Sequence, residues 1–501
     1  MLDKELILTF VSVLFFIASL LFAAFLPRKS LKIIVGTLSF IYIATLVFDL
    51  LLFFIFGKHF GLFVVSFFNT SIKGAPFTSF AREILILSAI CFAILLFCIV
   101  ISIRMIKIDR ISKFSFLFIP WIVAAFLLNP FCIYAYEFYS QLNPRVDDIK
   151  KQIYPYLAVP APRKPTKRKN IVYIFLESFD RAYTDEQLFS GLTPRLNALK
   201  NRMDFTNITQ VRDTEFTIKG FFGAHCAANY TFVPSDELNS KNFSTNITCA
   251  SEILKSVGYY AYFLKGASLA FQGTDGFLKQ RRYDEMKGKE QILEQNSAAR
   301  LNEWGVQDDD MLGVAYGDFE RLSKREKPFL MGLITLSTHS PNGFVPNSCE
   351  DLYYSESDAQ MLRAVHCTDR LVSDFIEKIR TSKYGKDTIV VVQNDHPLFY
   401  SSNTSGDFGD KLKGSKDLFV IFDDDLNGEF TIEKRGTSFD TFTTVLGYLG
   451  ILDEMNFGRN LLARDSLPFL ADSEFFNNAS KVFTKISYDE AVKAQKLGFV
   501  K

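Results

Sequence analysis

Three ionisable side chains stand at the ends of two apolar runs of this chain. Glu177 closes the run IVYIFLE, and the pair Asp395 and His396 follows the run TIVVVQN. Such runs predict buried strands, and open α/β sheets bind ligands outside the carboxyl ends of their strands. Carboxylate and imidazole ligands suit a divalent cation such as Mn²⁺ or Zn²⁺. The coincidence predicts a metal site, although Glu177 alone is typical of a polar strand end and His396 alone of a buried histidine.

Thr217 opens the segment TIKGFFGAHC, which is apolar and has the length of a helix. A threonine at this position is by default an N-cap, whose side chain satisfies a free backbone N–H. The same position suits a nucleophile, because a helix N-terminus presents amide donors and positive potential to a phosphate. A metal on the hydroxyl would lower its pKa and produce an alkoxide. With three candidate ligands elsewhere in the chain, we favour the nucleophile.

The distribution of apolar residues predicts a membrane domain. The chain has 501 residues, 48% of them hydrophobic, and a formal net charge of +1, which gives no indication of nucleic-acid binding. This length allows about two to four domains. Four apolar runs, roughly 5–26, 33–57, 84–103 and 114–135, approach or exceed the ~20 residues that cross a bilayer. We therefore predict a four-helix transmembrane domain over residues 1–140.

Basic residues predict the orientation of these spans. The first short loop holds Arg28, Lys29 and Lys32, and the loop between the third and fourth spans holds Arg104, Lys107, Arg110 and Lys113. The positive-inside rule places both loops in the cytoplasm. The chain after about residue 136 is then delivered outside. This predicts a multi-pass protein of the inner (cytoplasmic) membrane whose soluble part faces the periplasm.

The remainder of the chain divides into three regions. Residues 141–169 are rich in proline and basic residues and predict an extended juxtamembrane linker. Residues 170–464 alternate strand-like and helical patterns, which predicts an α/β catalytic domain with a largely parallel central sheet. Residues 465–501 form a polar tail that we expect to pack on that domain. The expected strands are 170–178, 259–264, 329–336, 388–394 and 418–422, and the expected helices are 194–202, 217–227, 248–256, 308–324 and 357–381.

Cysteines support an exported domain. Cys226, Cys249, Cys349 and Cys367 are the four cysteines after residue 140. An even number of cysteines in an exported domain suggests disulfides. Counting does not separate the three possible pairings, of which the pairing of neighbours, 226 with 249 and 349 with 367, is the simplest. Four buried free thiols are the alternative.

The order and spacing of the motifs resemble one family, the membrane-anchored phosphoglycerol transferases that decorate periplasmic glucans. These group with lipoteichoic acid synthases and phosphoethanolamine transferases in the alkaline-phosphatase and sulfatase superfamily. The matching segments are NIVYIFLESFD, LTPRLNAL, TIKGFFGAHC, FLKGASLAFQG, EWGVQDDDML, PFLMGLITLSTHSPNGF, AVHCTDRLVSDFIEKIRTSKYGKDTIVVVQNDH and FGRNLL. The C/S-x-P-x-R motif that sulfatases need for their modified nucleophile is not present, which argues against sulfatase activity.

The resemblance implies roles for the candidate residues. Glu177, Asp395 and His396 match three metal ligands, and Thr217 matches a nucleophile that is itself a ligand. The implied cofactor is one divalent cation, with Mn²⁺ usual in the phosphoglycerol branch, and Zn²⁺ or Mg²⁺ as the alternatives. His339, in STHSPNGF, matches a histidine that contacts the transferred phosphoglycerol.

Four further residues bear on the substrate. Trp304 lies in a recurring W-G-x-x-D segment, and we assign it to substrate binding without a defined role. Lys265 stands where glucan-type enzymes more often carry glycine, and it leaves room for an extra contact to an anion. Asn394 and Pro397 flank the Asp-His pair with residues that the family pattern does not predict.

The implied reaction is a double displacement. The threonine attacks the phosphodiester of a lipid donor such as phosphatidylglycerol, diacylglycerol leaves, and a hydroxyl of an envelope glycan attacks the phosphoglyceryl-threonine intermediate. The alternative enzyme is a phosphoethanolamine transferase acting on lipid A or another glycan. A different class, a catalytically inactive envelope scaffold, is disfavoured by the intact set of four site residues. The sequence gives no oligomeric state.

Overall fold

The computed structural model describes residues 4–56, 59–61, 64–65, 81–108, 111–142, 146–229, 247–340, 342–357, 359–398, 408–470 and 487–496. The chain forms two compact units. The first comprises the described residues of Met1–Phe67 and Pro76–Asn143, and the second comprises those of Pro144–Lys501.

The first unit is helical. Its helices are α1 (Lys4–Ala23), α2 (Lys29–Phe56), α4 (Ala81–Ile106), the short 3₁₀ helix η2 (Lys113–Leu117), α5 (Phe118–Leu127) and α6 (Pro130–Leu142). Lys29–Phe53 and Ser88–Ile106 are long and apolar enough to cross a membrane, whereas Ile7–Ala23 is shorter. Lys113–Leu127 and Pro130–Tyr139 form a pair bent by 64°. The described residues therefore give two spans, or three if the bent pair is one span, so the predicted count of four is not confirmed.

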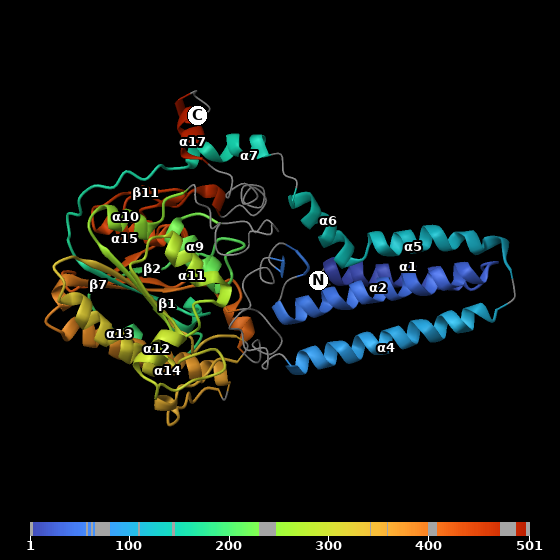
Figure 1. Ribbon diagram of the computed structural model, residues 1–501, viewed down its shortest axis with the longest axis horizontal. Coiled ribbons are helices and arrows are strands. Elements are labelled where there is room, and N and C mark those ends of the chain that lie inside the picture. Colours follow the sequence, from blue (N-terminus) through green and yellow to red (C-terminus); the bar gives the residue numbers. More distant parts are fainter. Residues whose placement is uncertain are drawn as a thin grey trace. The chain divides into compact units, whose positions relative to one another are not determined.

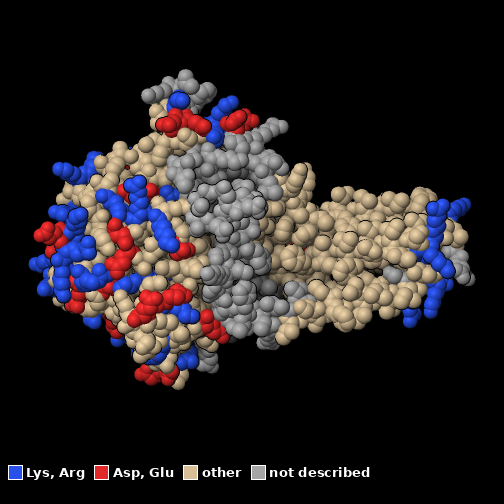
Figure 2. Space-filling view, viewed as in Figure 1, with Lys and Arg blue, Asp and Glu red and all other residues tan. Residues whose placement is uncertain are grey.

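The surface of this unit suits a lipid environment. Large apolar side chains such as Phe10, Leu21 and Phe92 are more than 60% exposed, while Tyr42 is buried and stacks on Phe16 at a centroid distance of 4.2 Å. Lysine and arginine side chains gather at one end of the unit (Figure 2). There the Nζ of Lys32 donates to the carbonyl of Met105, 2.9 Å away. Both basic loops thus lie at the same end, as the positive-inside rule requires.

The second unit is built on an eight-stranded sheet of order β5-β4-β6-β1-β7-β8-β2-β9. Its strands are β1 (Asn170–Leu176), β2 (Arg202–Phe205), β4 (Tyr260–Lys265), β5 (Glu285–Lys287), β6 (Phe329–Ile334), β7 (Thr388–Asn394), β8 (Phe419–Phe422) and β9 (Glu429–Ile432). The strands β5, β4, β6, β1 and β7 pair in parallel, and β8 is antiparallel to both β7 and β2. The largely parallel sheet predicted from the alternation of patterns is therefore observed.

Helices cover both faces of the sheet (Figure 1). One face carries α12 (Lys289–Gln295), α13 (Asp308–Ser323) and α14 (Gln360–Thr381), and the other carries α9 (Thr217–Cys226), α10 (Ala250–Ser256), α11 (Thr274–Gln280) and α15 (Thr441–Tyr448). Strand β1 shows why the sheet is buried on both sides. Val172 and Ile174 belong to the core shared with α13 and α14, whereas Tyr173 stacks on Phe442 of α15 at 4.6 Å. Alternate side chains thus enter opposite layers, which explains why β1 is an almost continuous apolar run.

Two expectations are wrong in detail. The expected helix 194–202 ends early, as α8 (Pro194–Ala198), and β2 begins at Arg202. The linker is not extended throughout, because α7 (Val146–Ile153) and the 3₁₀ turn Tyr154–Tyr156 lie within it. Of the C-terminal tail, residues 471–486 and 497–501 lie outside the described part, and α17 (Tyr488–Lys496) contacts α7 through a Glu490–Lys150 ion pair of 2.8 Å.

Candidate active site

Four neighbouring strands of the sheet deliver the candidate residues at their carboxyl ends. Lys265 ends β4, His339 follows β6, Glu177 follows β1, and Asp395 follows β7. These strands are adjacent in the order β4-β6-β1-β7 and run in parallel, so their carboxyl ends share one edge of the sheet. Ligands bind at this edge in open α/β sheets.

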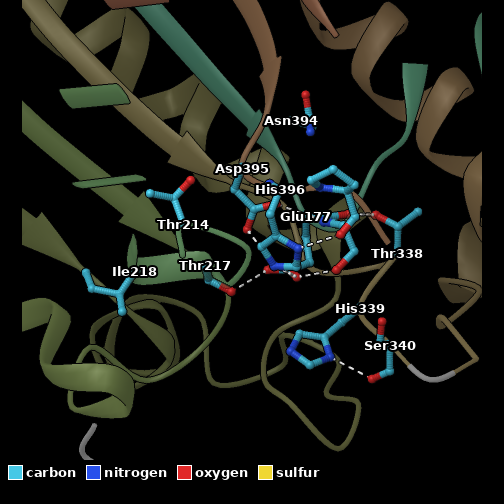
Figure 3. Close-up of polar contacts among 12 residues, drawn as sticks. Glu177, Thr214, Thr217, Ile218, Thr338, His339, Ser340, Asn394, Asp395 and His396 are labelled. Carbon is cyan, nitrogen blue, oxygen red and sulfur yellow. Dashed lines mark hydrogen bonds and ion pairs between the residues drawn. The ribbon is translucent and has the colours of Figure 1, made fainter. Parts of the chain in front are cut away.

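Glu177, Asp395 and His396 meet in a buried cluster (Figure 3). One ligand atom of each lies within 4.8 Å of those of the other two, and each residue is at most 2% exposed. The Nε2 atom of His396 lies 3.4 Å from Oε1 of Glu177 and 3.6 Å from Oδ2 of Asp395. The structure thus brings together three residues that lie up to 219 positions apart in the sequence.

The cluster concentrates charge away from water. Burial raises the pKa of Asp395 well above its ordinary value, and the charge of Glu177 raises it further. Burial opposes ionisation of Glu177 as well, but His339 and His396 outweigh that effect and hold the pKa of Glu177 well below its usual range. Burial also disfavours the charged form of His396, yet the two carboxylates raise its pKa to about 9. Two buried carboxylates at this separation repel each other, and a cation relieves such repulsion.

The hydrogen bonds around the cluster fit a divalent cation. Asp395 accepts the backbone N–H of Ser178 and of His396 on Oδ1, at 2.9 and 2.7 Å. Its Oδ2 is buried and has no hydrogen-bond partner among the residues that the structure describes. The Nδ1–H of His396 donates to the carbonyl of Pro397, 2.8 Å away, so Nε2 is the ring atom that would bind a cation on loss of its proton. Carboxylate oxygens and one imidazole nitrogen suit Mn²⁺, Mg²⁺ or Zn²⁺.

Thr217 lies beside this cluster as the first residue of α9. The N-cap is Phe216, so Thr217 does not cap the helix with its own side chain. Its Oγ1 donates to Oε2 of Glu177 at 3.1 Å, and the residue is half-buried. The hydroxyl is therefore oriented toward the candidate metal ligands, which is the placement that a nucleophile requires and a cap does not.

Gly220 allows α9 to approach the cluster, and the sequence analysis does not single it out. A Cβ atom at this position would lie 2.0 Å from the carbonyl oxygen of Asp395 and 3.2 Å from that of Thr214. Only a residue without a side chain fits so close to another backbone. The signal in the sequence is a glycine inside a helical pattern, which generally has a packing or functional reason.

His339 lies near Glu177 and is held on two sides. Its Nδ1–H donates to the carbonyl of Ser340 at 2.7 Å, and the ring of Trp304 stacks on it at a centroid distance of 3.7 Å. Burial lowers its pKa below the ordinary value, although Glu177 opposes this shift. In its neutral form, with the Nδ1 proton engaged, His339 presents Nε2 as a hydrogen-bond acceptor. Trp304 thus lies in the site through its contact with His339.

Lys265 lies within electrostatic reach of Glu177, and Gln272 contacts the start of α9. Lys265 is buried, its Nζ donates to Oγ1 of Thr274 at 2.8 Å, and burial lowers its pKa to about 8. Gln272 is a residue that the sequence analysis misses. It adopts a left-handed conformation with φ of 55°, and its Oε1 accepts the backbone N–H of Ile218 at 3.0 Å. Strained non-glycine residues of this kind gather at functional sites.

The residues flanking the Asp-His pair support it. Asn394 is fully buried and joins β7 to the segment before β8, because it donates to Asp417 at 3.1 Å and accepts from Leu418 N–H at 2.8 Å. Pro397 supplies the carbonyl that fixes the His396 ring. Their departure from the family pattern therefore does not disturb the cluster.

Two disulfides lie in the second unit. Cys226 pairs with Cys249, and Cys349 pairs with Cys367. The first joins the last residue of α9 to the residue that precedes α10, and the second joins the loop after β6 to α14. Both therefore restrain elements that carry or border the candidate site.

Comparisons with known proteins identify the class. The sulfatase family profile matches residues 169–451, so the chain belongs to the sulfatase family. A crystal structure of a protein in the alkaline phosphatase superfamily from Vibrio parahaemolyticus superimposes with a TM-score of 0.52 and 22% identity, covering 64% of this chain and 80% of that one. The second unit is thus an α/β domain of the alkaline-phosphatase and sulfatase type.

Among curated proteins, the chain is similar to phosphoglycerol transferase I of two bacteria. It is 34% identical to that of Xanthomonas euvesicatoria pv. vesicatoria over 319 residues, which is 61% of this chain and 45% of the relative. It is 35% identical to that of Escherichia coli O6:K15:H31 over 331 residues, which is 64% of this chain and 42% of the relative. The match therefore spans less than half the length of these relatives.

Proposed function

We propose that this protein is a metal-dependent phosphotransferase that moves phosphoglycerol from phosphatidylglycerol to an envelope glycan. The observation that carries the proposal is the hydroxyl of Thr217, 3.1 Å from a carboxylate oxygen of Glu177 and beside Asp395 and His396. The similarity to phosphoglycerol transferase I supports the choice of headgroup.

In this proposal Glu177, Thr217, Asp395 and His396 hold one divalent cation, with Mn²⁺ preferred. When bound, such a cation supplies positive charge that lowers the pKa of a hydroxyl and neutralises phosphoryl oxygens. The rest of the chemistry belongs to the protein. Glu177 orients the hydroxyl through the observed hydrogen bond, and the other three ligands are buried beside the half-buried Thr217.

The reaction that we propose has two displacements at phosphorus. Thr217 Oγ1 attacks the phosphodiester, the bond to the diacylglycerol oxygen breaks, and diacylglycerol leaves with the proton of the threonine. A glycan hydroxyl then attacks the phosphoglyceryl-threonine, the Thr217–phosphorus bond breaks, and the proton returns to the threonine oxygen. His339 accepts a hydrogen bond from a glycerol hydroxyl on Nε2, and Trp304 holds the imidazole in place.

The helices of the first unit fit a lipid donor. Two helices, or three counting the bent pair, are apolar and long enough to cross a membrane, which indicates a membrane anchor. We propose a multi-pass protein of the inner membrane with a periplasmic catalytic domain at 170–464. This placement brings the site to the side where lipid headgroups and envelope glycans meet, and it suits disulfides.

Incubation of the 501-residue chain with phosphatidylglycerol or phosphatidylethanolamine in mixed micelles, with Mn²⁺, tests the proposal. We expect diacylglycerol release from phosphatidylglycerol and a mass increase of one phosphoglycerol group on Thr217. Thr217→Ala should lose the adduct and at least about 10²-fold in turnover, while the folded protein still binds the cation, more weakly, through Glu177, Asp395 and His396. Thr217→Ser should keep part of both.

Three outcomes would overturn parts of the proposal. Faster release from phosphatidylethanolamine would change the headgroup and leave the nucleophile in place. Full activity in a folded Thr217→Ala protein would remove the threonine mechanism. A protein that turns over neither lipid and binds no metal would be an envelope scaffold instead of an enzyme.

A further inference from the structure

A second cavity of about 390 Å³ lies in the same unit as the candidate active site. Two loops and the first turn of α14 line it, through Asn302, Gln307, Phe344, Val345, Pro346, Glu350, Gln360 and Arg363. Its volume is in the range of small-ligand sites, which is about 300–1,000 Å³. None of the residues assigned to the transfer chemistry lines it.

The walls of this cavity are fixed before any ligand binds. The Cys349–Cys367 disulfide ties the loop of residues 344–350 to α14. Gln307 and Asn347 exchange two hydrogen bonds of 2.9 and 3.0 Å, which tie the same loop to the segment before α13. A preformed cavity loses little conformational entropy when a ligand binds.

The cavity is joined to the active site by short structural links. Oδ1 of Asn302, in the cavity wall, accepts the backbone N–H of Trp304 at 2.9 Å, and the Trp304 ring stacks on His339. On the other side, Gly343 directly precedes Phe344, which lines the cavity, and its N–H donates to the carbonyl of His339 at 3.0 Å. The cavity wall is therefore in direct contact with the segments that hold Trp304 and His339.

The polar groups of the wall comprise both donors and acceptors. The amide oxygen of Asn302 accepts the backbone N–H groups of Trp304 and Gly305, so its NH₂ group can donate to a ligand. Gln360 donates its NH₂ to the carbonyl of Gly343 at 2.8 Å, which leaves its amide oxygen. Arg363 contributes its guanidinium group, whose Nη2 lies 3.5 Å from the carbonyl oxygen of Glu350 and whose plane lies over the Tyr353 ring, and the exposed Glu350 adds a carboxylate.

This mixture selects one chemical class of ligand. Sugar hydroxyls both donate and accept, so they satisfy amide NH₂, amide oxygen, guanidinium and carboxylate groups together. A phosphate offers acceptors alone and is repelled by Glu350, which offsets the attraction of Arg363. Phe344 adds an apolar surface for the carbon face of a sugar ring. We propose that the cavity binds a sugar residue of an uncharged oligosaccharide acceptor, and this inference rests on the proposed transfer reaction.

Binding of a fluorescently labelled mixture of α- and β-linked glucotetraoses to the full-length protein tests the inference. We expect Arg363→Ala to weaken binding about tenfold, the effect of one lost charge-assisted hydrogen bond. Gln360→Ala, a milder change, should weaken it less. The matched control is Lys378→Ala, an exposed basic residue near the other end of α14, which should bind like the wild type. Inorganic phosphate and sn-glycerol 1-phosphate should not displace the tetraoses.

The same preparations should be assayed for diacylglycerol release without an acceptor. Release should be unchanged in Arg363→Ala and Gln360→Ala, because neither residue belongs to the proposed transfer chemistry. Three outcomes would overturn the glycan assignment even if lipid turnover supports the transferase. They are no tetraose binding to the wild type, binding to Arg363→Ala and Gln360→Ala as tight as to the wild type, and displacement of the tetraoses by phosphate. If the protein turned over no lipid but bound the tetraoses in a manner that depends on Arg363, the proposed transferase function would be wrong and the proposed sugar site would stand.

Discussion

The substitution Gly220→Ala tests whether the close approach of α9 to the sheet edge sets up the site. The Cβ of the alanine would lie 2.0 Å from the carbonyl oxygen of Asp395, whereas ordinary contact begins at 3.4 Å. Either α9 or the segment of Asp395 must therefore move by about 1.4 Å. The obstructing atoms belong to the backbone, so no side-chain rotation relieves the clash. Thr217 lies one turn earlier on α9 and would move with it.

The expected effect is large on function and small on folding. A misplacement of about 1 Å in a reacting group costs about 10²-fold in rate. Alanine is by itself a better helix former than glycine by about 1 kcal/mol, which partly offsets the clash in the folding free energy. We therefore expect diacylglycerol release to fall at least about 10²-fold. Binding of Mn²⁺, measured as metal content and as the Mn²⁺-dependent rise in Tm, should weaken because Asp395 is also displaced.

Three control variants separate the clash from the general effect of replacing a helical glycine. Gly313→Ala and Gly317→Ala lie on α13, where a new Cβ would have no atom within 4 Å, so activity should be unchanged and stability unchanged or raised. On α9 itself, Gly223→Ala would bring Cβ to 3.1 Å from the buried Phe439 ring, a clash with a side chain that is much smaller than the clash of Gly220→Ala with the backbone, so the loss of turnover should also be much smaller. Wild-type turnover and metal content in Gly220→Ala would show that the site does not depend on this approach, and the reasoning would fail.

Three further results are expected. The double variant Asp395→Ala, His396→Ala should lose bound metal by elemental analysis and lose the Mn²⁺-dependent rise in Tm; wild-type metal content would place the cation elsewhere. Burial raises the pKa of Asp369 from 3.8 to about 6. The folded state therefore favours the protonated carboxyl, whose contribution to stability is complete below pH 3.8 and is lost as the pH rises through 6, a change of about 3 kcal/mol. The Tm of Asp369→Asn relative to wild type should therefore increase between pH 4 and 7, and a constant difference would contradict the assignment. Replacing Cys349 and Cys367 by serine opens a link between residues 18 apart and should cost about 3 kcal/mol of stability, read from the Tm without reductant.

The sequence is most informative where one element has one dominant signal. The buried strands β1, β6 and β7 are continuous apolar runs, and their positions agree with the structure to within two residues. Short strands at the sheet edge, such as β5 and β9, have three and four residues and no comparable run. Their pairing is decided by neighbouring strands, which local patterns do not contain. The sequence also does not predict helix α7, because nearby prolines dominate the composition of the linker.

The same distinction applies to the site. Glu177 and the Asp395–His396 pair can be recognised because each directly follows a strand, and parallel strands bring their ends together. Gly220 and Gln272 act through the backbone of another element, and such contacts depend on the distance between a helix and a sheet edge. That distance is a property of the packed domain, so no pattern in a single sequence predicts it.

The arrangement of the four strands also separates the chemistry from the choice of substrate. The metal-type ligands Glu177, Asp395 and His396 follow β1 and β7, while the residues that we propose to face the substrate follow β4 and β6. The segment after β6 belongs to both groups, because Thr335 Oγ1 accepts the N–H of Glu177 at 3.1 Å and Thr338 donates to its carbonyl, one residue before His339. A change at His339 that disturbs this backbone would therefore displace Glu177. The loop from Lys265 to Thr274 makes no such hydrogen bonds to Glu177 among the described residues. Substitutions in this loop should therefore alter headgroup preference more readily without loss of the metal site.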